Sequence, residues 1–400
     1  MKSDKSTPNV PTLRFAEYTD EWHKYALSDF VTRITRRNKN NESSLPLTIS
    51  AQYGLVDQVM FFNKTVASVD LSGYYLLYNG DFAYNKSYSN DYAWGAVKRL
   101  DRYDKGCLSS LYFVFRPKDS VDSDYLTHYF ETKKWHKGIS EIAGEGARNH
   151  GLLNMAVDDY FATKHFLPAI DEQKKIAAFL NKIEKRIEIQ NKIISKYESL
   201  IKGLVDYLLD RKGLRYSFKD LYVKAGEGGT PATENKDYYA EGTIPFIKIE
   251  DLNTKYIIHN NDYISELGLK KSSAWMVPDN SIIYSNGATI GSISINKYPV
   301  ATKQGILGIV PSKLVLTEYL YYYMQTTYFR KQIKRITVRG TMDCAYLKDI
   351  NSIPCFVPSV CEQQNYIKIL FSIDKKINTE RIILNKLKEQ KRYLLSNLFI

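Results

Sequence analysis

The sequence predicts a mixed α/β protein of the α+β class, built as an internal repeat in which a domain is followed by a long helix, twice over. Three observations predict this. The frame F-x-P-x-x-x-E-Q occurs at Phe166 and again at Phe356. An apolar stripe with a helical period follows each copy. The regions that precede the two frames also resemble each other in several stretches.

The repeat predicts two long helices. Residues 166–209 align with residues 356–399 without a gap, and 12 of the 44 positions are identical. Apolar residues recur in steps of three and four, which is the 3.5-residue period of a coiled coil. Each copy therefore predicts one helix of roughly 38 residues, about 57 Å long. Because two matching stripes in one chain can bury each other, we expect a coiled coil; the alternative is that each helix packs only on its own domain.

The residues at the start of each copy suit a helix N-terminus. Pro168 and Pro358 precede the helices, where proline stiffens the entry without removing a helical hydrogen bond. Glu172 and Glu362 fall in the first turn, where the helix dipole favours a carboxylate.

The regions between the helices predict two similar domains. "WHKYALSDF" resembles "GLRYSFKDL", "YNGDFAYNKS" resembles "PDNSIIYSNG", and "DYLTHYFETKKW" resembles "EYLYYYMQTTYF". Both regions mix short β-branched and aromatic runs with turn residues, as mixed α/β domains do. The predicted divisions are an N-terminal arm with the first domain, the central helix, the second domain and the distal helix, at residues 1–165, 166–212, 213–355 and 356–400.

Composition narrows the class of protein. The 400 residues hold 56 Lys and Arg against 44 Asp and Glu, a net charge of +12 that favours a polyanionic partner, nucleic acid first, although many basic proteins bind none. The sequence has no apolar run of membrane-spanning length and no signal-peptide core near its start, so we expect a cytoplasmic protein without a membrane partner. Four scattered cysteines fit a reducing compartment and offer no zinc site, so no metal is expected.

No catalytic motif stands out. A methyltransferase acting on adenine needs a polar-Pro-Pro-aromatic loop, and no Pro-Pro pair occurs in the chain. A nucleotide-hydrolysing G-x-x-x-x-G-K-[ST] loop is also missing. These observations favour an adaptor that binds and positions. A single-chain DNA methyltransferase or nuclease with unrecognised motifs, and a coiled-coil scaffold without a DNA role, remain as alternatives.

Several stretches together resemble the DNA-specificity subunit of type I restriction-modification systems. They are "VPTLRFAEYTDEW" at 10–22, "GGTPATENKDYYAEGTIPFIKIEDL" at 228–252, "ATKQGILGIVP" at 301–311, and the two P-x-x-x-E-Q helices. The resemblance covers nearly the whole chain. One departure is that "GLRYSFKDL" lacks the tryptophan found at Trp22, and the two domains differ between their matched patches. We therefore expect them to read different half-sites.

The resemblance implies the function and the partners. Each α/β domain would be a target recognition domain, and the helices would form an antiparallel coiled coil that relates the two halves by a pseudo-twofold axis. The chain would be a non-catalytic subunit that binds double-stranded DNA at a bipartite, asymmetric target. Two copies of the modification (methyltransferase) subunit would dock on it, with a restriction (translocase) subunit as a further partner. The chain would hold no cofactor, because S-adenosylmethionine belongs to the modification subunit.

Two sets of residues are candidates for these contacts. Arg and Lys suit guanine, and Asn and Gln suit adenine, so polar residues on equivalent loops are the predicted DNA contacts. They are Lys86, Ser87, Lys98, Arg99, Arg102, Arg148 and Asn149 in the first domain, and Ser285, Asn286, Lys303, Gln304, Arg339 and Thr341 in the second. The predicted coiled-coil and subunit-docking residues are Glu172, Gln173, Ile183, Ile187, Gln190, Glu362, Gln363, Ile373, Ile377 and Glu380. Among these, we expect Gln190 and Glu380 to lie close together and fix the register.

Overall fold

The computed structural model describes residues 9–87, 92–143, 152–338, 340 and 343–400. It divides into two units, of which the first holds residues 1–191 and 383–400 and the second holds residues 192–382. Each long helix therefore contributes one part to each unit. Within the described residues, no helix combines the length and the apolar character needed to cross a membrane.

The first unit is built on an antiparallel sheet in the order β2-β9-β6-β7. Its strands are β2 (Val31–Arg33), β9 (Phe113–Pro117), β6 (Phe82–Asn85) and β7 (Ala96–Arg99). Three antiparallel pairs accompany it: β1 (His23–Ala26) with β10 (Lys164–Leu167), β3 (Leu47–Ser50) with β4 (Gly54–Asp57), and β5 (Tyr75–Tyr78) with β8 (Lys105–Leu108). The short helices are α1 (Leu27–Phe30), α2 (Gln58–Phe62), α3 (Ser123–Tyr129), α4 (His136–Ile142) and α5 (Val157–Ala162).

Aromatic side chains form the core of the first unit. The rings of Tyr84 and Tyr160 stack with centroids 4.7 Å apart, and those of Phe82 and Phe115 stack at 5.5 Å. Trp22, the residue before β1, is 1% exposed and belongs to the same core. The core also takes in residues of both long helices: Ile176, Leu180, Ile183, Leu394 and Leu398.

The second unit contains a five-stranded sheet in the order β12-β19-β16-β17-β14. Its strands are β12 (Tyr222–Glu227), β19 (Ile306–Pro311), β16 (Ile282–Ser285), β17 (Ile293–Asn296) and β14 (Tyr256–Ile257). The remaining strands are β15 (Tyr263–Ile264), β13 (Ile244–Ile247) and β18 (Ala301–Thr302) in one sheet, and the pair β11 (Leu214–Ser217) and β20 (Pro354–Val357). The short helices are α7 (Glu266–Lys270), α8 (Thr317–Tyr323), α9 (Thr327–Ile336) and α10 (Leu347–Ile350), with 3-10 turns η1 (Phe218–Leu221), η2 (Lys236–Tyr238) and η3 (Ile249–Asp251).

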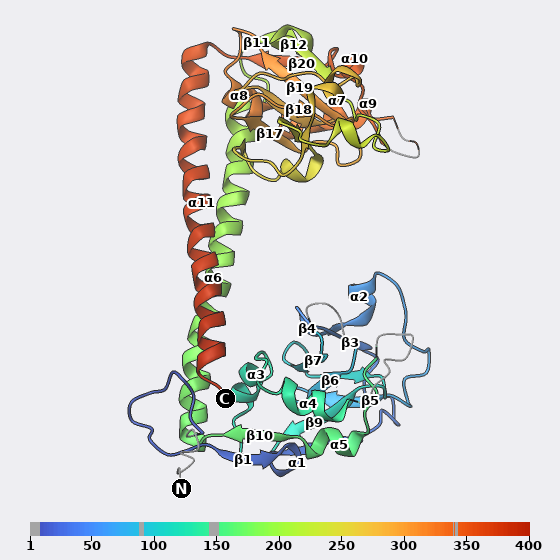
Figure 1. Ribbon diagram of the computed structural model, residues 1–400, viewed down its shortest axis with the longest axis vertical. Helices are drawn as coiled ribbons and strands as arrows, with labels where there is room; N and C mark the ends of the chain where they lie inside the picture. Colours follow the sequence, from blue (N-terminus) through green and yellow to red (C-terminus); the bar gives the residue numbers. More distant parts are fainter. Residues whose placement is uncertain (1–8, 88–91, 144–151, 339, 341–342) are drawn as a thin grey trace. The chain divides into compact units, whose positions relative to one another are not determined.

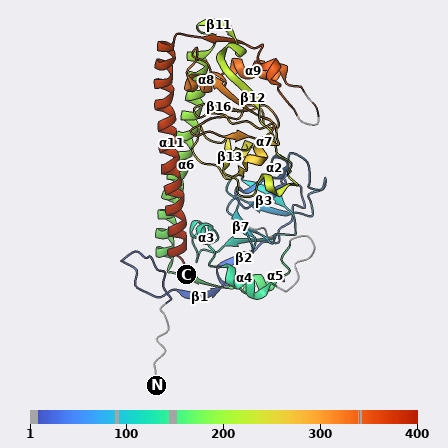
Figure 2. The same cartoon turned by 45° about the horizontal axis from the view of Figure 1, so that its top comes forward.

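The two long helices are α6 (Ile170–Leu209) and α11 (Val360–Asn397). They run side by side in opposite directions (Figure 1, Figure 2). In the first unit Lys391 donates to the Glu184 carboxylate at 2.6 Å, and in the second Arg381 donates to Glu198 at 2.6 Å. Leu370 and Val205 join the core of the second unit. The apolar stripes therefore pack both between the two antiparallel helices and against the two domain cores. The coiled coil and the packing of the helices on the domains, given above as alternatives, thus both occur.

The structure confirms the internal repeat. The sequence matches place β1, β6 and α3 of the first unit opposite β11, β16 and α8 of the second. The strand pairing agrees, since β1 pairs with β10 as β11 pairs with β20, and β6 pairs with β9 as β16 pairs with β19. The mixed α/β class, the two similar domains and the antiparallel coiled coil are thus as predicted.

Candidate nucleic-acid interface

Loops from distant parts of the second unit meet at one end of its main sheet. The backbone N–H of Asn286, which follows β16, donates to the carbonyl of Gly305, which precedes β19, at 3.0 Å. The N–H of Gly287 donates to the same carbonyl at 3.2 Å. Val338 and Cys344 exchange two backbone hydrogen bonds, and Gly287 forms a bridge with Cys344. The segment after β16, the turn between β18 and β19, and residues 338 and 344 therefore meet at one end of the sheet.

Lys303 and Gln304 are exposed at this end of the sheet. They occupy the tight turn between β18 and β19, in which Gly305 adopts a φ of +83° that favours glycine. The turn is held by its backbone, because the N–H of Lys303 donates to the carbonyl of Ile247 at 3.0 Å and that of Gly305 donates to Glu227 at 2.8 Å. Within the described part of the chain neither side chain has a hydrogen-bond or ion-pair partner, so both remain available to a ligand.

Ser285 and Asn286 do not face solvent. Both are 0% exposed. The Ser285 hydroxyl donates to the carbonyl of Gly287 at 2.9 Å, and the Asn286 amide donates to the carbonyl of Ala345 at 3.2 Å. Direct base contact by these two residues is therefore not supported, because their polar groups hold the loops in place from inside the unit.

The described candidates in the first unit lie at opposite ends of its sheet. Strand β6 is antiparallel to β7, with Asn85 opposite Ala96 and Phe82 opposite Arg99. Lys86 and Ser87 therefore lie at one end, matching the loop end of the second unit, while Lys98, Arg99 and Arg102 lie at the other. Ser87 is exposed, and the half-buried Lys86 places its ammonium 4.7 Å from the ring centroid of Phe113.

Two of the basic candidates in the first unit are already paired with carboxylates. Lys98 forms an ion pair with Glu131. Arg99 donates to Asp101 at 2.6 Å and to Asp124 at 2.7 Å, so its charge is compensated within the unit. Arg102 is exposed and, among the described residues, makes no hydrogen bond or ion pair. Four further candidates, Arg148, Asn149, Arg339 and Thr341, lie outside the described residues.

The glutamines of the repeated frame clamp each domain to its helix. The Gln173 amide donates to the carbonyl of Pro168 at 2.9 Å, and its oxygen accepts from the N–H of Asp122 at 2.9 Å. Gln363 donates to the carbonyls of Pro358 and Leu314 at 3.0 and 2.9 Å and accepts from Leu316 at 2.9 Å. Gln173 is 2% and Gln363 is 0% exposed. Their side chains are enclosed by their own unit, and a part for them in docking another subunit stays a prediction.

The glutamates of the frame differ between the two copies. Glu172 is 1% exposed and accepts two hydrogen bonds of 2.8 Å from the Arg14 guanidinium. Glu362 is exposed and accepts from the N–H and hydroxyl of Ser359 at 3.0 and 2.7 Å, and these hydrogen bonds lower the pKa of its carboxyl. Glu172 therefore belongs to the fold of the first unit, whereas Glu362 is open to a partner.

The remaining predicted coiled-coil residues lie on the buried or half-buried face of the helices. Ile183 and Ile377 are 5% and 6% exposed, and Ile187 and Ile373 are half-buried. Gln190 and Glu380 are 8% and 7% exposed, and Lys376 donates to Glu380 at 2.7 Å. Close approach of Gln190 to Glu380 stays a prediction. Apolar side chains that do face solvent on the two helices are Ile189, Leu200, Tyr207, Val360, Ile369, Phe371, Ile382, Ile383 and Tyr393.

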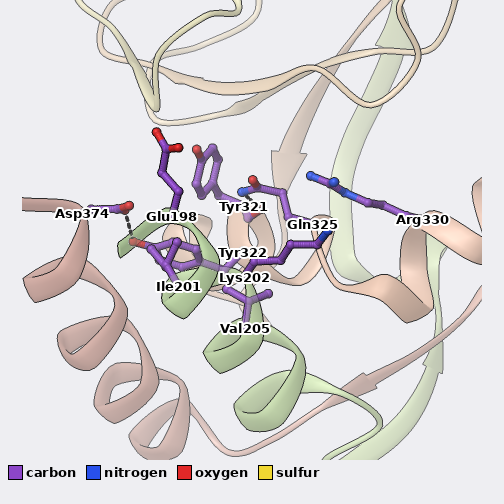
Figure 3. Close-up of a pocket in the computed structure, with 9 residues that line it drawn as sticks. All are labelled: Glu198, Ile201, Lys202, Val205, Tyr321, Tyr322, Gln325, Arg330 and Asp374. Atoms are coloured by element: carbon purple, nitrogen blue, oxygen red, sulfur yellow. Dashed lines mark hydrogen bonds between the residues drawn. The ribbon is translucent and has the colours of Figure 1, made fainter. Parts of the chain in front are cut away.

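A pocket in the second unit marks where its domain joins both helices. It measures about 180 Å³ and is lined from α6, α8, α9 and α11, with Arg330 and Gln325 on one side and Asp374 on the other (Figure 3). The Tyr322 hydroxyl donates to the Asp374 carboxylate, and burial together with this contact raises the pKa of Tyr322. Lys255 donates to the same hydroxyl at 2.6 Å and to Asp374 at 3.2 Å.

The sequence reasoning missed this cluster. The Lys255 ammonium lies 4.2 Å from the Tyr322 ring centroid and 5.3 Å from those of Tyr256 and Tyr321. Burial lowers the pKa of Lys255, and Asp374 opposes that shift. Lys255, which precedes β14, and Asp374, on α11, therefore tie the domain to that helix. The tyrosine-rich stretch at 319–323 was the signal available in the sequence.

The comparisons with known proteins agree on one family. The model of the type I restriction modification DNA specificity domain matches residues 216–389. The chain is 32% identical over 166 residues to the type I restriction enzyme MjaIX specificity subunit of Methanocaldococcus jannaschii, covering 41% of this chain and 38% of that protein. It is 25% identical over 245 residues to the EcoR124I/EcoR124II specificity subunit of Escherichia coli, covering 56% and 58%. These matches therefore span less than two thirds of either relative.

The fold is also found in a solved structure. A chain from a structural study of assembly and conformational transition of the type I R-M system superposes with a TM-score of 0.60. The match covers 94% of this chain and 97% of that one, at 14% identity. At that identity the match shows the shared fold alone.

Proposed function

The chain belongs to the family of type I restriction-modification DNA-specificity subunits, and we propose that it gives such a complex its target sequence without catalysing a reaction itself. Each unit would read one half-site, so the target would consist of two different short sequences separated by a gap. The helix pair would set the length of that gap. This proposal includes an adenine-specific methyltransferase activity for the whole complex, located on another subunit.

The observation that carries the proposal is that one architecture occurs twice with different loop chemistry. Equivalent strands β6 and β16 end at loops that begin "NKSYSND" in the first unit and "SNGATIG" in the second. Two readers of one fold should diverge at the surfaces that contact bases, since base edges are read by hydrogen-bonding side chains. A scaffold without a DNA role has no need for that divergence.

We place the DNA contacts at the loop end of each sheet. The side chains that support this choice are Lys303 and Gln304 in the second unit, and Lys86 and Ser87 in the first. Ser87, Lys303 and Gln304 are exposed, which leaves room for a groove edge or a phosphate, whereas Arg99 is engaged by two carboxylates. Arg102, at the opposite end of the first sheet, is a candidate for a phosphate contact.

The partners follow from the repeat. Two equivalent halves offer two equivalent docking positions, which supports two copies of a modification subunit, each bringing S-adenosylmethionine. A restriction subunit would join where the system encodes one. Double-stranded DNA in the cytoplasm is the proposed substrate of the assembly.

One experiment separates this proposal from the single-chain enzyme. The purified chain is mixed with labelled S-adenosylmethionine and DNA, with and without a modification subunit. We expect methyl transfer only when both proteins are present, at one bipartite sequence. Methyl transfer by the chain alone would overturn the proposal and favour a methyltransferase with unrecognised motifs.

A further inference from the structure

In the first unit an N-terminal arm, residues 9–22, covers the start of α6. The Arg14 guanidinium holds the Glu172 carboxylate through two hydrogen bonds of 2.8 Å. The Phe15 ring packs edge-on against Phe179, with centroids 5.8 Å apart. The backbone N–H of Leu13 donates to the carbonyl of Asn397 at 2.9 Å, which ties the arm to the end of α11 as well. The Leu13-Arg14-Phe15 triplet thus contacts both the start of α6 and the end of α11.

The second unit has the equivalent surface on its helices, but among the described residues no arm covers it. The constant offset of the repeat makes Glu362 the counterpart of Glu172, Ile369 that of Phe179, and Tyr207 that of Asn397. Glu362 is exposed, Ile369 is 46% exposed and Tyr207 is 73% exposed. The carboxylate and apolar positions that the arm occupies in the first unit are therefore open in the second.

A cavity of about 410 Å³ adjoins this open surface. It is lined mainly by apolar groups, among them Leu214, Leu314 and Val360, which are 70%, 38% and 43% exposed. Glu362 and Lys313 are the charged residues of its lining. Gly213 also lines it, at the place in the repeat where the first unit has the buried Trp22. The second unit thus lacks both the arm and the indole that the first unit has at the equivalent places.

We propose that the surface formed by Tyr207, Leu214, Val360, Glu362 and Ile369 binds an extended segment of another protein that presents an apolar residue, an arginine and an aromatic residue in succession. The arginine would pair with Glu362 as Arg14 pairs with Glu172. The aromatic ring would cover Ile369 as Phe15 covers Phe179. The segment must come from elsewhere, because this chain has a single arm and the first unit already holds it. A second copy would have its own arm engaged in the same way.

The probe for this site is a labelled peptide with the sequence of residues 9–22, titrated into the full chain. We expect saturable binding seen by fluorescence anisotropy, and slower amide exchange at residues 360–370. Replacing the peptide arginine by alanine should weaken binding at least about tenfold, since a charge-assisted bidentate pair is lost. Ile369→Asn in the chain should weaken it as well, and Glu362→Gln should repeat the effect of the altered peptide.

A matched control is available on the same helix. Ile382 is 58% exposed and lies outside the proposed surface, so Ile382→Asn should leave binding unchanged. The proposal is overturned if Ile369→Asn and Ile382→Asn behave alike, or if no saturable binding occurs up to about 1 mM peptide, where ΔG of binding is only about −4 kcal/mol. It is also overturned if exchange slows at residues 172–179 instead, because the peptide would then be displacing the chain's own arm. Methylation specificity is a separate readout, so these outcomes do not depend on the proposed function.

Discussion

Truncating the buried glutamine of the second frame, Gln363→Ala, should destabilise the second unit strongly. The side chain is 0% exposed and makes three hydrogen bonds, accepting from the N–H of Leu316 and donating to the carbonyls of Leu314 and Pro358. Each hydrogen bond contributes about 1 kcal/mol net, and an N–H left buried without a partner costs about 1–3 kcal/mol. The free energy of unfolding should therefore fall by about 3–5 kcal/mol.

Urea unfolding of the full chain, with amide exchange at residues 314–316 to report on the second unit, measures this loss. The Gln173 side chain makes two hydrogen bonds, one fewer than Gln363. The free energy of unfolding of the first unit should therefore fall by less in Gln173→Ala, by about 2–4 kcal/mol. Gln304→Ala is the control, because that side chain is exposed and should change stability by less than about 0.5 kcal/mol. A loss below about 1 kcal/mol for Gln363→Ala, or one equal to the control, would refute the clamp.

Three further predictions concern the interface, the pH dependence and the arm. Lys303→Ala should weaken specific DNA binding of the complex by about 1–3 kcal/mol while the exposed Lys331→Ala does not, as measured by salt titrations. Burial lowers the pKa of His165 from 6.5 to about 4. The first unit should therefore lose about 3 kcal/mol of its free energy of unfolding as the pH falls from 6.5 to 4. Urea unfolding at several pH values measures this loss, and His165→Gln should remove it. Arg14→Ala leaves Glu172 buried without its cation and should cost the first unit about 3 kcal/mol, which double mutation with Glu172→Gln should largely restore.

The fold was predictable because its signals are local and repeated. A 3.5-residue period and a proline before the first turn predicted helices that the structure places at Ile170–Leu209 and Val360–Asn397. The matched stretches also identified β1 and β6 of the first unit as the equivalents of β11 and β16 of the second. Periodicity reports which face of an element is apolar, and that is enough to assign helices and their pairing.

The site was less predictable, because loop sequences do not reveal which polar side chains are enclosed. Asn286 and Lys303 are both polar residues beside strand ends, yet Asn286 is buried by backbone partners from residues far along the chain and Lys303 is exposed. Arg99 is of a residue type that suits a DNA contact, yet its guanidinium is paired with the carboxylates of Asp101 and Asp124. Gln363 belongs to the repeated frame for a reason that only the packed domain shows.

Exchange of one recognition domain tests most directly the central claim that each unit recognises its own half-site. Residues 213–355 of this chain are replaced by the corresponding domain of a relative, and methylated adenines are mapped across a genome in cells that contain the modification subunit. We predict that one half-site changes while the other half-site and the gap length are kept, because each unit reads its own sequence and the helices set the spacing. Loss of both half-sites in a complex that still methylates, or an unchanged methylation pattern, would contradict the account.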